Sequence, residues 1–502
     1  ELDAAIDSYK QALKIKPDYA EAYTNMGNAL KEKGELELAM DCYKKAIEIK
    51  PRYTEASTQA CKVAAQMADW VYVSKIKDNL LYKQNEVSLS VYGLLALEDR
   101  PTLFLEKMTK LVRAKYQDTF QYKHRPFQKS KRIKVGYFSS YFRQHPVSTL
   151  SVQMLEYQNK EQFETYAFHY GPDNNDDYNL RMRDTFNHFI NVSKMSDKDI
   201  AQLACKKGID IAIDFNGFMR GCRVGIFAHR PAPIQINYLA YPWTMGASFY
   251  DYIIADHTVI PEEQRDDYSE NIIYLPNCYM PQDNTRQISD KKISRIDCGL
   301  ADYAFVFCCF NHSFKISPKE FDIWMRLLIK VEKSSLWLLK YNRWAEVNLK
   351  AEARKRGIDP VRLVFADHLP FDEHLGRFKL ADLFLDTFNF NAHTTASDAL
   401  WAGLPVITKM GKGFSARVAG SLLTALELPE MITTSEKEYE QLALDLALKP
   451  DKLVKIRNKL NEKRLSAPLF DTESYTQNLE KAYKIAYQRY VDGLQPTEFK
   501  VV

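Results

Sequence analysis

A histidine followed by two threonines stands between a short apolar stretch and a helical stretch in the second half of the chain. The apolar stretch is 383–386, and His393, Thr394 and Thr395 directly precede the helical residues. Free backbone N–H groups and hydroxyls at a helix N-terminus bind anions, because the helix dipole is positive there. His393 would add a third donor, and Asp398, one turn further on, could accept from a ribose hydroxyl. The alternative is an ordinary N-cap formed by Thr394 or Thr395.

A lysine follows another apolar stretch of the same half. Residues 304–310 are mainly apolar, and Lys315 comes shortly after them. The ammonium group of a lysine is a compact point charge that can neutralise a phosphate leaving group. A lone lysine at the end of a strand is usually just solvated, so this interpretation depends on Lys315 lying in the same half as the His393 segment.

His374 and Arg377 belong to a loop that starts at Asp367, passes Pro370 and runs into a predicted helix. His374 could stack on a nucleobase, and Arg377 could face a phosphate. A surface loop with an incidental histidine explains the same residues equally well.

His145 is the corresponding candidate in the first half. It follows the apolar stretch 133–138 and precedes Pro146. Because a residue before proline is held extended, we expect His145 to be presented from a constrained loop. An imidazole with a pKa near neutrality can orient or deprotonate an acceptor hydroxyl, although most single histidines are not catalytic.

These segments require a scaffold that brings the ends of several strands together. From residue 133 onward, short apolar stretches alternate with helical ones, which is typical of parallel α/β sheets. The apolar stretches are 133–138, 166–170, 209–215, 234–241, 252–255 and 272–275 in a first series, and 304–310, 335–340, 363–366, 383–386 and 404–408 in a second. We expect two Rossmann-like half-domains, with ligands in a cleft at the carboxyl ends of the strands.

The N-terminal residues contain an internal repeat. Alanine, tyrosine, alanine and proline recur at the tetratricopeptide period of about 34 residues, first as Ala5, Tyr9, Ala12 and Pro17 and then as Ala39, Tyr43, Ala46 and Pro51. A helical array needs about three repeats to bury its faces. We therefore expect this short array to lean on the later part of the chain or on further repeats of a longer parent protein, through which the protein could also form homo-oligomers. Two unrelated amphipathic helices are the alternative.

We predict five units along the chain, with a boundary in the basic passage 123–134. They are tetratricopeptide repeats (1–55), a helical linker region (56–130), an N-terminal acceptor-side half (131–288), a C-terminal nucleotide-side half (289–470), and a C-terminal helix and tail (471–502).

Composition excludes several classes of protein. Lys and Arg number 69 against 65 Asp and Glu, with the charges interspersed, so a nucleic-acid partner is not indicated. The eight cysteines form no C-x-x-C pair, which favours reduced thiols in the cytoplasm or nucleus. Neither a membrane-length apolar run nor a P-loop or dinucleotide-binding glycine motif is present. The histidines lack the spacing of metal ligands, so we expect no metal cofactor.

The chain resembles the O-GlcNAc transferases, which also carry tetratricopeptide repeats before their catalytic region. The resemblance rests on ordered motifs spread over most of the chain: Val135-Gly136-Tyr137, His145-Pro146, the 230–235 segment Arg-Pro-Ala-Pro-Ile-Gln, Phe310-Asn311, Lys315-Ile316, His393-Thr394-Thr395 and Leu400-Trp401-Ala402-Gly403. It implies a GT-B fold and an inverting, metal-independent transfer of GlcNAc from UDP-GlcNAc to Ser or Thr hydroxyls of intracellular proteins.

The resemblance also implies roles for individual residues. The His393-Thr394-Thr395 segment would hold the diphosphate and Lys315 would neutralise it as it leaves, while His312 would belong to the nucleotide-sugar site. His374 and Arg377 would contact the nucleotide, and Asp398 the ribose. His145 would be the active-site histidine near the acceptor, and Asn25 would bind acceptor proteins or peptides along the repeat groove.

Several positions depart from the animal enzymes. His312 replaces Gln, Phe314 replaces Tyr, Phe371 replaces Lys, and Phe390 replaces a Cys of the pocket for the N-acetyl group. The donor is therefore less certain than the fold, and the alternatives are a GDP-fucose transferase, a UDP-glucose transferase or an inert repeat scaffold. The short connection 282–295 cannot hold the extra domain of the animal enzymes, so the chain is more similar to bacterial or protist members.

Overall fold

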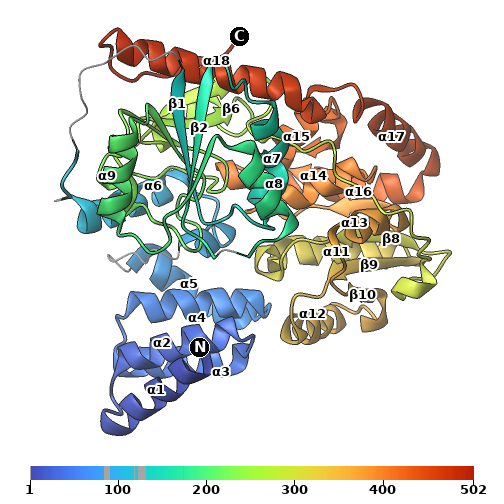
Figure 1. The fold of residues 1–502 in the computed structure, drawn as a ribbon. Helices are drawn as coiled ribbons and strands as arrows, with labels where there is room; N and C mark the ends of the chain where they lie inside the picture. Colours follow the sequence, from blue (N-terminus) through green and yellow to red (C-terminus); the bar gives the residue numbers. More distant parts are fainter. Residues whose placement is uncertain (1, 84–90, 118, 123–131, 173) are drawn as a thin grey trace.

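A computed structural model describes all residues except 1, 84–90, 118, 123–131 and 173 (Figure 1). The basic passage in which we predicted a domain boundary therefore lies largely outside the described residues. The rest forms a helical N-terminal segment and two α/β lobes.

Antiparallel helices form the N-terminal segment. They are α1 (Leu2–Ile15), α2 (Ala20–Glu32), α3 (Leu36–Ile49), α4 (Thr54–Gln66) and α5 (Trp70–Asp78), followed by a short 3-10 helix η2 (Val91–Ala96) and by α6 (Pro101–Tyr116). The small and large positions of the repeat pack on each other: a Cβ on Gly27 would lie only 2.7 Å from the ring of Tyr43, which is fully buried. The predicted repeat helices are thus confirmed.

The first lobe contains an eight-stranded sheet with the order β14-β7-β6-β5-β4-β1-β2-β3, and its recorded pairs are parallel. The strands are β1 (Ile133–Ser139), β2 (Phe163–His169), β3 (His188–Asn191), β4 (Ile211–Asp214), β5 (Ile234–Asn237), β6 (Tyr252–Asp256), β7 (Asn271–Leu275) and β14 (Phe499–Lys500). The helices are α7 (Pro146–Tyr157), α8 (Asp177–Thr185), α9 (Asp197–Lys207) and α10 (Gly225–Ala228).

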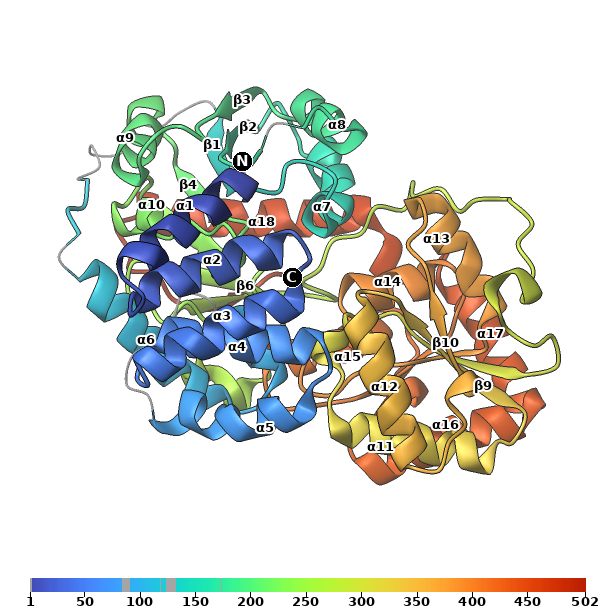
Figure 2. The same cartoon turned by 90° about the horizontal axis from the view of Figure 1, so that it is seen from below.

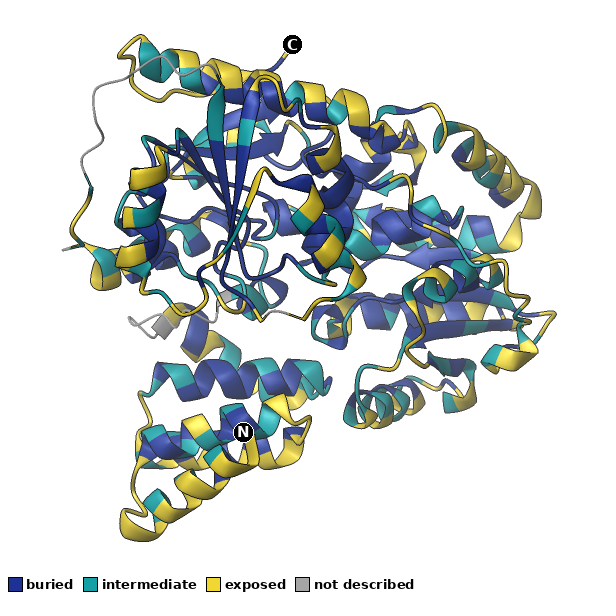
Figure 3. Ribbon diagram, viewed as in Figure 1, coloured by how far each residue is buried: buried dark blue, intermediate teal, exposed yellow. Residues whose placement is uncertain are grey.

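The second lobe repeats this architecture with a six-stranded sheet of order β10-β9-β8-β11-β12-β13. The strands are β8 (Phe305–Cys309), β9 (Ser334–Leu339), β10 (Leu363–Ala366), β11 (Leu383–Leu385), β12 (Val406–Lys409) and β13 (Ile432–Thr433). The helices are α11 (Pro318–Lys330), α12 (Arg343–Lys355), α13 (Phe371–Arg377), α14 (Thr394–Trp401), α15 (Val418–Ala425), α16 (Glu436–Leu448) and α17 (Pro450–Lys463). Burial is concentrated in the strands of both sheets (Figure 3).

The C-terminal helix α18 (Thr472–Val491) returns to the first lobe, where it packs on α7, β5 and β7. It crosses the whole lobe in Figure 1, and β14 then joins the edge of the first sheet beside β7. The predicted unit 471–502 is therefore physically part of the first lobe.

The N-terminal helices lie next to both lobes (Figure 2). The indole of Trp70 in α5 donates to the carbonyl oxygen of Ile316 at 3.1 Å, and Ser313 donates to the carbonyl oxygen of Gln66, the last residue of α4, at 2.6 Å. Both contacts come from the end of α4 and from α5, in the predicted linker region, so the array leans on the second lobe through the helices that directly follow it.

Among the described residues, no helix is long and apolar enough to cross a membrane. Nor do three His, Cys, Asp or Glu side chains of that part of the chain gather where they could hold a metal ion.

Candidate active site

Two neighbouring strands of the second lobe end at the same place, and the loops after them are tied together. Strands β8 and β11 are paired, and Asn311 after β8 donates to the hydroxyl of Thr387 after β11 at 2.8 Å. Asp386 is fully buried and accepts from the backbone N–H of Ala392 at 2.6 Å and from the hydroxyl of Thr408 at 2.6 Å. These bonds fix the loop that leads into α14.

Lys315 follows β8 in the 3-10 turn Ser313–Lys315 and contacts this loop. Its Nζ donates to the carbonyl oxygen of Asn391 at 2.8 Å and stands 4.2 Å from the ring centroid of Phe390. Burial lowers the pKa of Lys315 below its ordinary value, and the nearby carboxyl of Asp386 opposes this effect. An ammonium has three donors, so the cation beside α14 keeps donors for an anion.

The first turn of α14 begins at Thr394, with His393 in the N-cap position and without a side-chain cap. The two threonines are therefore the first helical residues and neither is the N-cap, which contradicts the alternative of an ordinary threonine cap. Backbone N–H groups of this turn are left available for an anion.

The ring of His393 stacks on Phe390 at 4.7 Å, and its Nε2 lies 3.1 Å from the carbonyl oxygen of Ser415. A carbonyl only accepts, so Nε2 carries the proton, and burial keeps the pKa of His393 well below its ordinary value. Nδ1 is then an acceptor. The bond to Ser415 uses the only proton of the neutral ring, so the role of His393 as a third donor to an anion stays a prediction.

His312 follows β8 in the second lobe and is the N-cap of the 3-10 turn Ser313–Lys315 that contains Lys315. Its ring stacks on Tyr341 at 4.0 Å, and it lines a cavity of about 530 Å³ between the α2–α3 turn and the second lobe. Burial and the charge of Lys315 lower the pKa of His312 to about 3, so the imidazole is neutral.

His374 and Arg377 lie together in α13. The guanidinium of Arg377 donates to the carbonyl oxygen of Asp367 at 2.6 Å and to Nδ1 of His374, and it packs over Phe310. Arg377 is only 2% exposed. The expectation that Arg377 faces a phosphate does not agree with this arrangement, because its buried guanidinium holds His374 in place instead.

Asp398 of α14 forms an ion pair with an arginine outside the second lobe. Its Oδ1 accepts from Nη1 of Arg286, which lies on the connection between the lobes, at 2.6 Å. Burial nevertheless raises the pKa of Asp398 to about 6. Only the second carboxylate oxygen remains for a ribose hydroxyl, and that role stays a prediction.

His145 is the N-cap residue of α7 in the first lobe. Its Nδ1 accepts from the backbone N–H of Val147 at 3.2 Å, and its ring stacks on Tyr141 at 3.7 Å. Burial and the charge of Arg143 lower the pKa of His145 to about 3. The neutral ring therefore carries its proton on Nε2, which makes it a hydrogen-bond donor and a poor general base.

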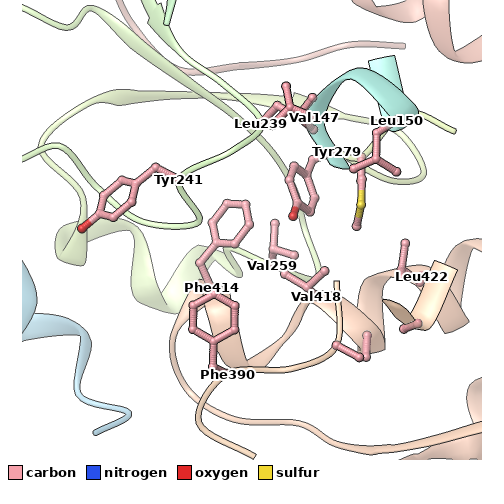
Figure 4. Packing of buried hydrophobic residues seen from close by; sticks show 14 of the residues in the cluster. Val147, Leu150, Leu239, Tyr241, Val259, Tyr279, Phe390, Phe414, Val418 and Leu422 are labelled. Atoms are coloured by element: carbon pink, nitrogen blue, oxygen red, sulfur yellow. The ribbon is translucent and has the colours of Figure 1, made fainter. Parts of the chain in front are cut away.

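Apolar side chains join the two lobes beside these groups (Figure 4). Val147 and Leu150 of α7 lie near Tyr279, and Tyr279 meets Phe414 of the second lobe at 4.7 Å between ring centroids. Phe414 lies next to Phe390, which supports Lys315. This seam brings the His145 end of α7 to the Lys315 side of the second lobe.

Tyr92 is a site residue that the sequence did not predict. Its ring meets Phe390 at 5.1 Å and Phe314 at 6.2 Å, and burial together with nearby Tyr141 raises its pKa. It therefore lies between the partner of His145 and the support of Lys315. No motif marked it, because it belongs to the linker region in which the repeat period is lost.

Phe390 and Asn25 occupy different surroundings. Phe390 is fully buried beneath Lys315, His393 and Tyr92, so it forms a floor and does not line the surface of a sugar pocket. Asn25 is exposed on α2, and its contact with an acceptor stays a prediction.

Comparisons with known proteins agree with this architecture. Residues 95–294 and 288–479 match the family model of glycosyl transferase family 41. Residues 1–34 match a TPR repeat model, and residues 20–53 match a tetratricopeptide repeat model.

Several curated proteins are similar in sequence. The chain is 38% identical over 378 residues to the "Probable UDP-N-acetylglucosamine--peptide N-acetylglucosaminyltransferase SEC" of Arabidopsis thaliana, covering 74% of this chain and 39% of that protein. It is 27% identical over 479 residues to the "UDP-N-acetylglucosamine--peptide N-acetylglucosaminyltransferase" of Caenorhabditis elegans, covering 73% of this chain and 42% of that protein. The chain thus spans less than half the length of these relatives.

A solved structure of a mutant Thermobaculum terrenum O-GlcNAc transferase is similar in fold. It superposes with a TM-score of 0.84 at 24% identity, covering 98% of this chain and 95% of that chain. The match confirms the predicted GT-B architecture with its preceding repeats.

Proposed function

This chain belongs to glycosyl transferase family 41, and we propose that it transfers GlcNAc from UDP-GlcNAc to Ser or Thr hydroxyls of proteins, with inversion and without a metal. One observation carries the proposal: a buried lysine and an uncapped helix N-terminus meet where strands β8 and β11 end. Lys315 donates to Asn391 two residues before His393, so its cation and the N–H groups of α14 act on the same region.

This arrangement suits the departure of a nucleoside diphosphate. When the acceptor oxygen bonds to the anomeric carbon, the bond from that carbon to the phosphate oxygen breaks, and negative charge develops on the diphosphate. Fixed donors that face this charge stabilise the transition state more than the ground state. Lys315 and the first turn of α14 are such donors.

The acceptor side is supplied by the first lobe and the linker. The Nε2–H of His145 would donate to an oxygen of the substrate and orient it, while Tyr141 and the cap on α7 hold the ring. The proton of the acceptor hydroxyl must pass to another group, because the lone pair of His145 is already used in the cap.

The identity of the donor sugar nucleotide is tested by measuring nucleotide binding and sugar transfer with the same protein. A ligand that binds only the folded state stabilises it by about 2.7 kcal/mol at a hundredfold excess over its Kd. We expect UDP and UDP-GlcNAc to raise the melting temperature, and labelled GlcNAc to appear on Ser-containing peptides in the presence of EDTA.

Stabilisation by GDP and GDP-fucose but not by UDP would contradict the assignment of UDP-GlcNAc as the donor. Transfer of glucose but not GlcNAc would do the same. An absence of both nucleotide binding and transfer would leave the repeat scaffold as the function.

A further inference from the structure

Two lysines of the N-terminal helices, one in α2 and one in α4, lie near the first lobe and the 3-10 helix η2. Lys62 of α4 packs its stem against Gly93, where an added Cβ would lie 2.9 Å from Cγ of the lysine. Lys31 of α2 donates to Oε1 of Gln59 at 2.9 Å. The positive charge of Arg220 from the first lobe contributes to lowering the pKa of both lysines. We call Lys31, Lys62 and Arg220 the basic cluster.

The carboxylates near the basic cluster are engaged with other groups. Glu32 pairs with Arg220, and Glu55 accepts from Nε2 of Gln59 at 2.8 Å. In the described part of the chain, Lys62 makes no ion pair and no hydrogen bond. A partly buried ammonium without a partner is unfavourable unless an anion joins it. Burial and the two neighbouring cations accordingly lower the pKa of Lys62 to about 8.

The position of the basic cluster relates it to the candidate active site. Gly93, which supports Lys62, directly follows Tyr92, whose ring meets Phe390 beneath Lys315. On the other side, the carbonyl oxygen of Arg220 accepts from the hydroxyl of Tyr141 at 2.6 Å, and Tyr141 stacks on His145. The cluster thus connects to both halves of the site, on the side from which the repeat segment would deliver an acceptor.

We propose that the basic cluster selects acceptor segments that carry an aspartate or glutamate side chain near the Ser or Thr to be modified. The carboxylate would pair with Lys62 and Lys31, and the hydroxyl would reach the region between His145 and Lys315. This inference rests on the proposed function and adds to it the chemical class of acceptor.

The test compares short peptides that share one central Ser and differ in a single position. At each position along the peptide, Asp is compared with Asn, and kcat/KM is measured with saturating UDP-GlcNAc. A charge-assisted hydrogen bond predicts that the Asp peptide is favoured about tenfold at one or two positions, equivalent to about 1.4 kcal/mol. We expect this ratio to fall towards one in the Lys31→Gln/Lys62→Met double variant, and Lys62→Glu to favour Lys peptides instead.

Matched variants separate charge from packing. Lys62→Arg keeps the charge and should keep the preference for Asp. Lys45→Met removes an exposed lysine of α3 that is paired with Glu48, and it should leave the ratio unchanged. An unchanged melting temperature with UDP shows that each variant is folded.

Peptide binding, measured by fluorescence polarisation, distinguishes the proposed acceptor selection from the proposed transferase function. If labelled sugar is transferred but the Asp and Asn peptides react equally at every position, the selection is wrong while the transferase function stands. If no sugar is transferred yet Asp peptides still bind in a Lys62-dependent way, the selection stands and the transferase function is wrong.

Discussion

At the scale of the residue, backbone groups decide what each side chain of the site can do. His393 gives its proton to a carbonyl oxygen, whereas His145 gives its lone pair to an N–H group. The two imidazoles therefore present opposite atoms, an acceptor from His393 and a donor from His145. Neither property can be seen in the sequence.

Lys315→Met tests the cation at the leaving group. The methionine keeps the packing on Phe390 but removes the charge, so we expect kcat/KM to fall by about 10²–10³-fold, as for loss of one oxyanion-hole donor. Lys333→Met, which removes an exposed lysine of the same lobe, should have no effect. Steady-state rates with UDP-GlcNAc provide the measurement, and a fall below threefold would contradict the role.

The lowered pKa of Lys315 also predicts a pH dependence. The charged form exists below the pKa, so activity is lost as pH rises through it, and burial moves this loss below the ordinary value of 10.5. We expect the alkaline limb of kcat/KM to disappear in Lys315→Met, which its pH profile would show.

His145→Asn separates a donor from a base. Asparagine is a good N-cap whose Oδ1 can accept from Val147 while its amide still donates, but it cannot remove a proton near neutral pH. We expect Asn to retain activity within about tenfold and Ala to lose about a hundredfold or more. Because the pKa of His145 is about 3, the wild type should show no titration of this residue between pH 5 and 8. Equal losses in Asn and Ala would favour a base.

The sequence identified the residues that come after strands but not those that hold them. Lys315, His393 and His145 could be predicted because each comes after an apolar stretch. Tyr92 and Arg286 could not, since their roles depend on contacts with Phe390 and Asp398 that are far away in the chain.

At the scale of the element, long apolar stretches were predictable and short ones were not. Every predicted stretch from 133 onward overlaps a strand. Strands β3, β13 and β14 were missed, because β3 is only partly buried and the other two have two residues each. These three strands are defined by their pairing with neighbouring strands, and a local apolar pattern does not predict such pairing.

The contact of Gly27 with Tyr43 predicts how the repeat segment can be disrupted. A leucine at position 27 would overlap the buried ring, and overpacking of this kind costs about 1–3 kcal/mol or more. We expect Gly27→Leu to open α2 and α3 to proteolysis and to raise KM for peptides, while UDP still stabilises the lobes. Lys14→Ala on α1 is the control, and a protease-resistant Gly27→Leu protein would contradict the packing.

At the scale of the whole molecule, the first lobe is completed by the end of the chain. The sheet order places β14 beside β7, and α18 covers α7 and β5. The second lobe is thus inserted between the parts of the first. The predicted tail at 471–502 did not reveal this, because helical periodicity does not specify which surface a helix covers.

Removal of α18 should therefore destabilise the first lobe, although strands β1 to β7 of that lobe lie far from α18 in the sequence. Leu479, Ala482, Tyr483 and Ala486 are at most 1% exposed, so truncation after Asp471 would uncover their apolar partners across the lobe. At about 25 cal/mol per Å² of apolar surface, exposing the surface that these residues cover costs a large part of the roughly 5–15 kcal/mol by which native proteins are stable. We expect the truncated protein to aggregate or to lose protection of β1–β7 in hydrogen exchange.

Truncation after Gly493 removes β14 but leaves α18, and should retain a folded lobe with a lower melting temperature. A soluble, protected first lobe without α18 would show that the helix is an appendage, and that the lobe folds from residues before the second lobe alone.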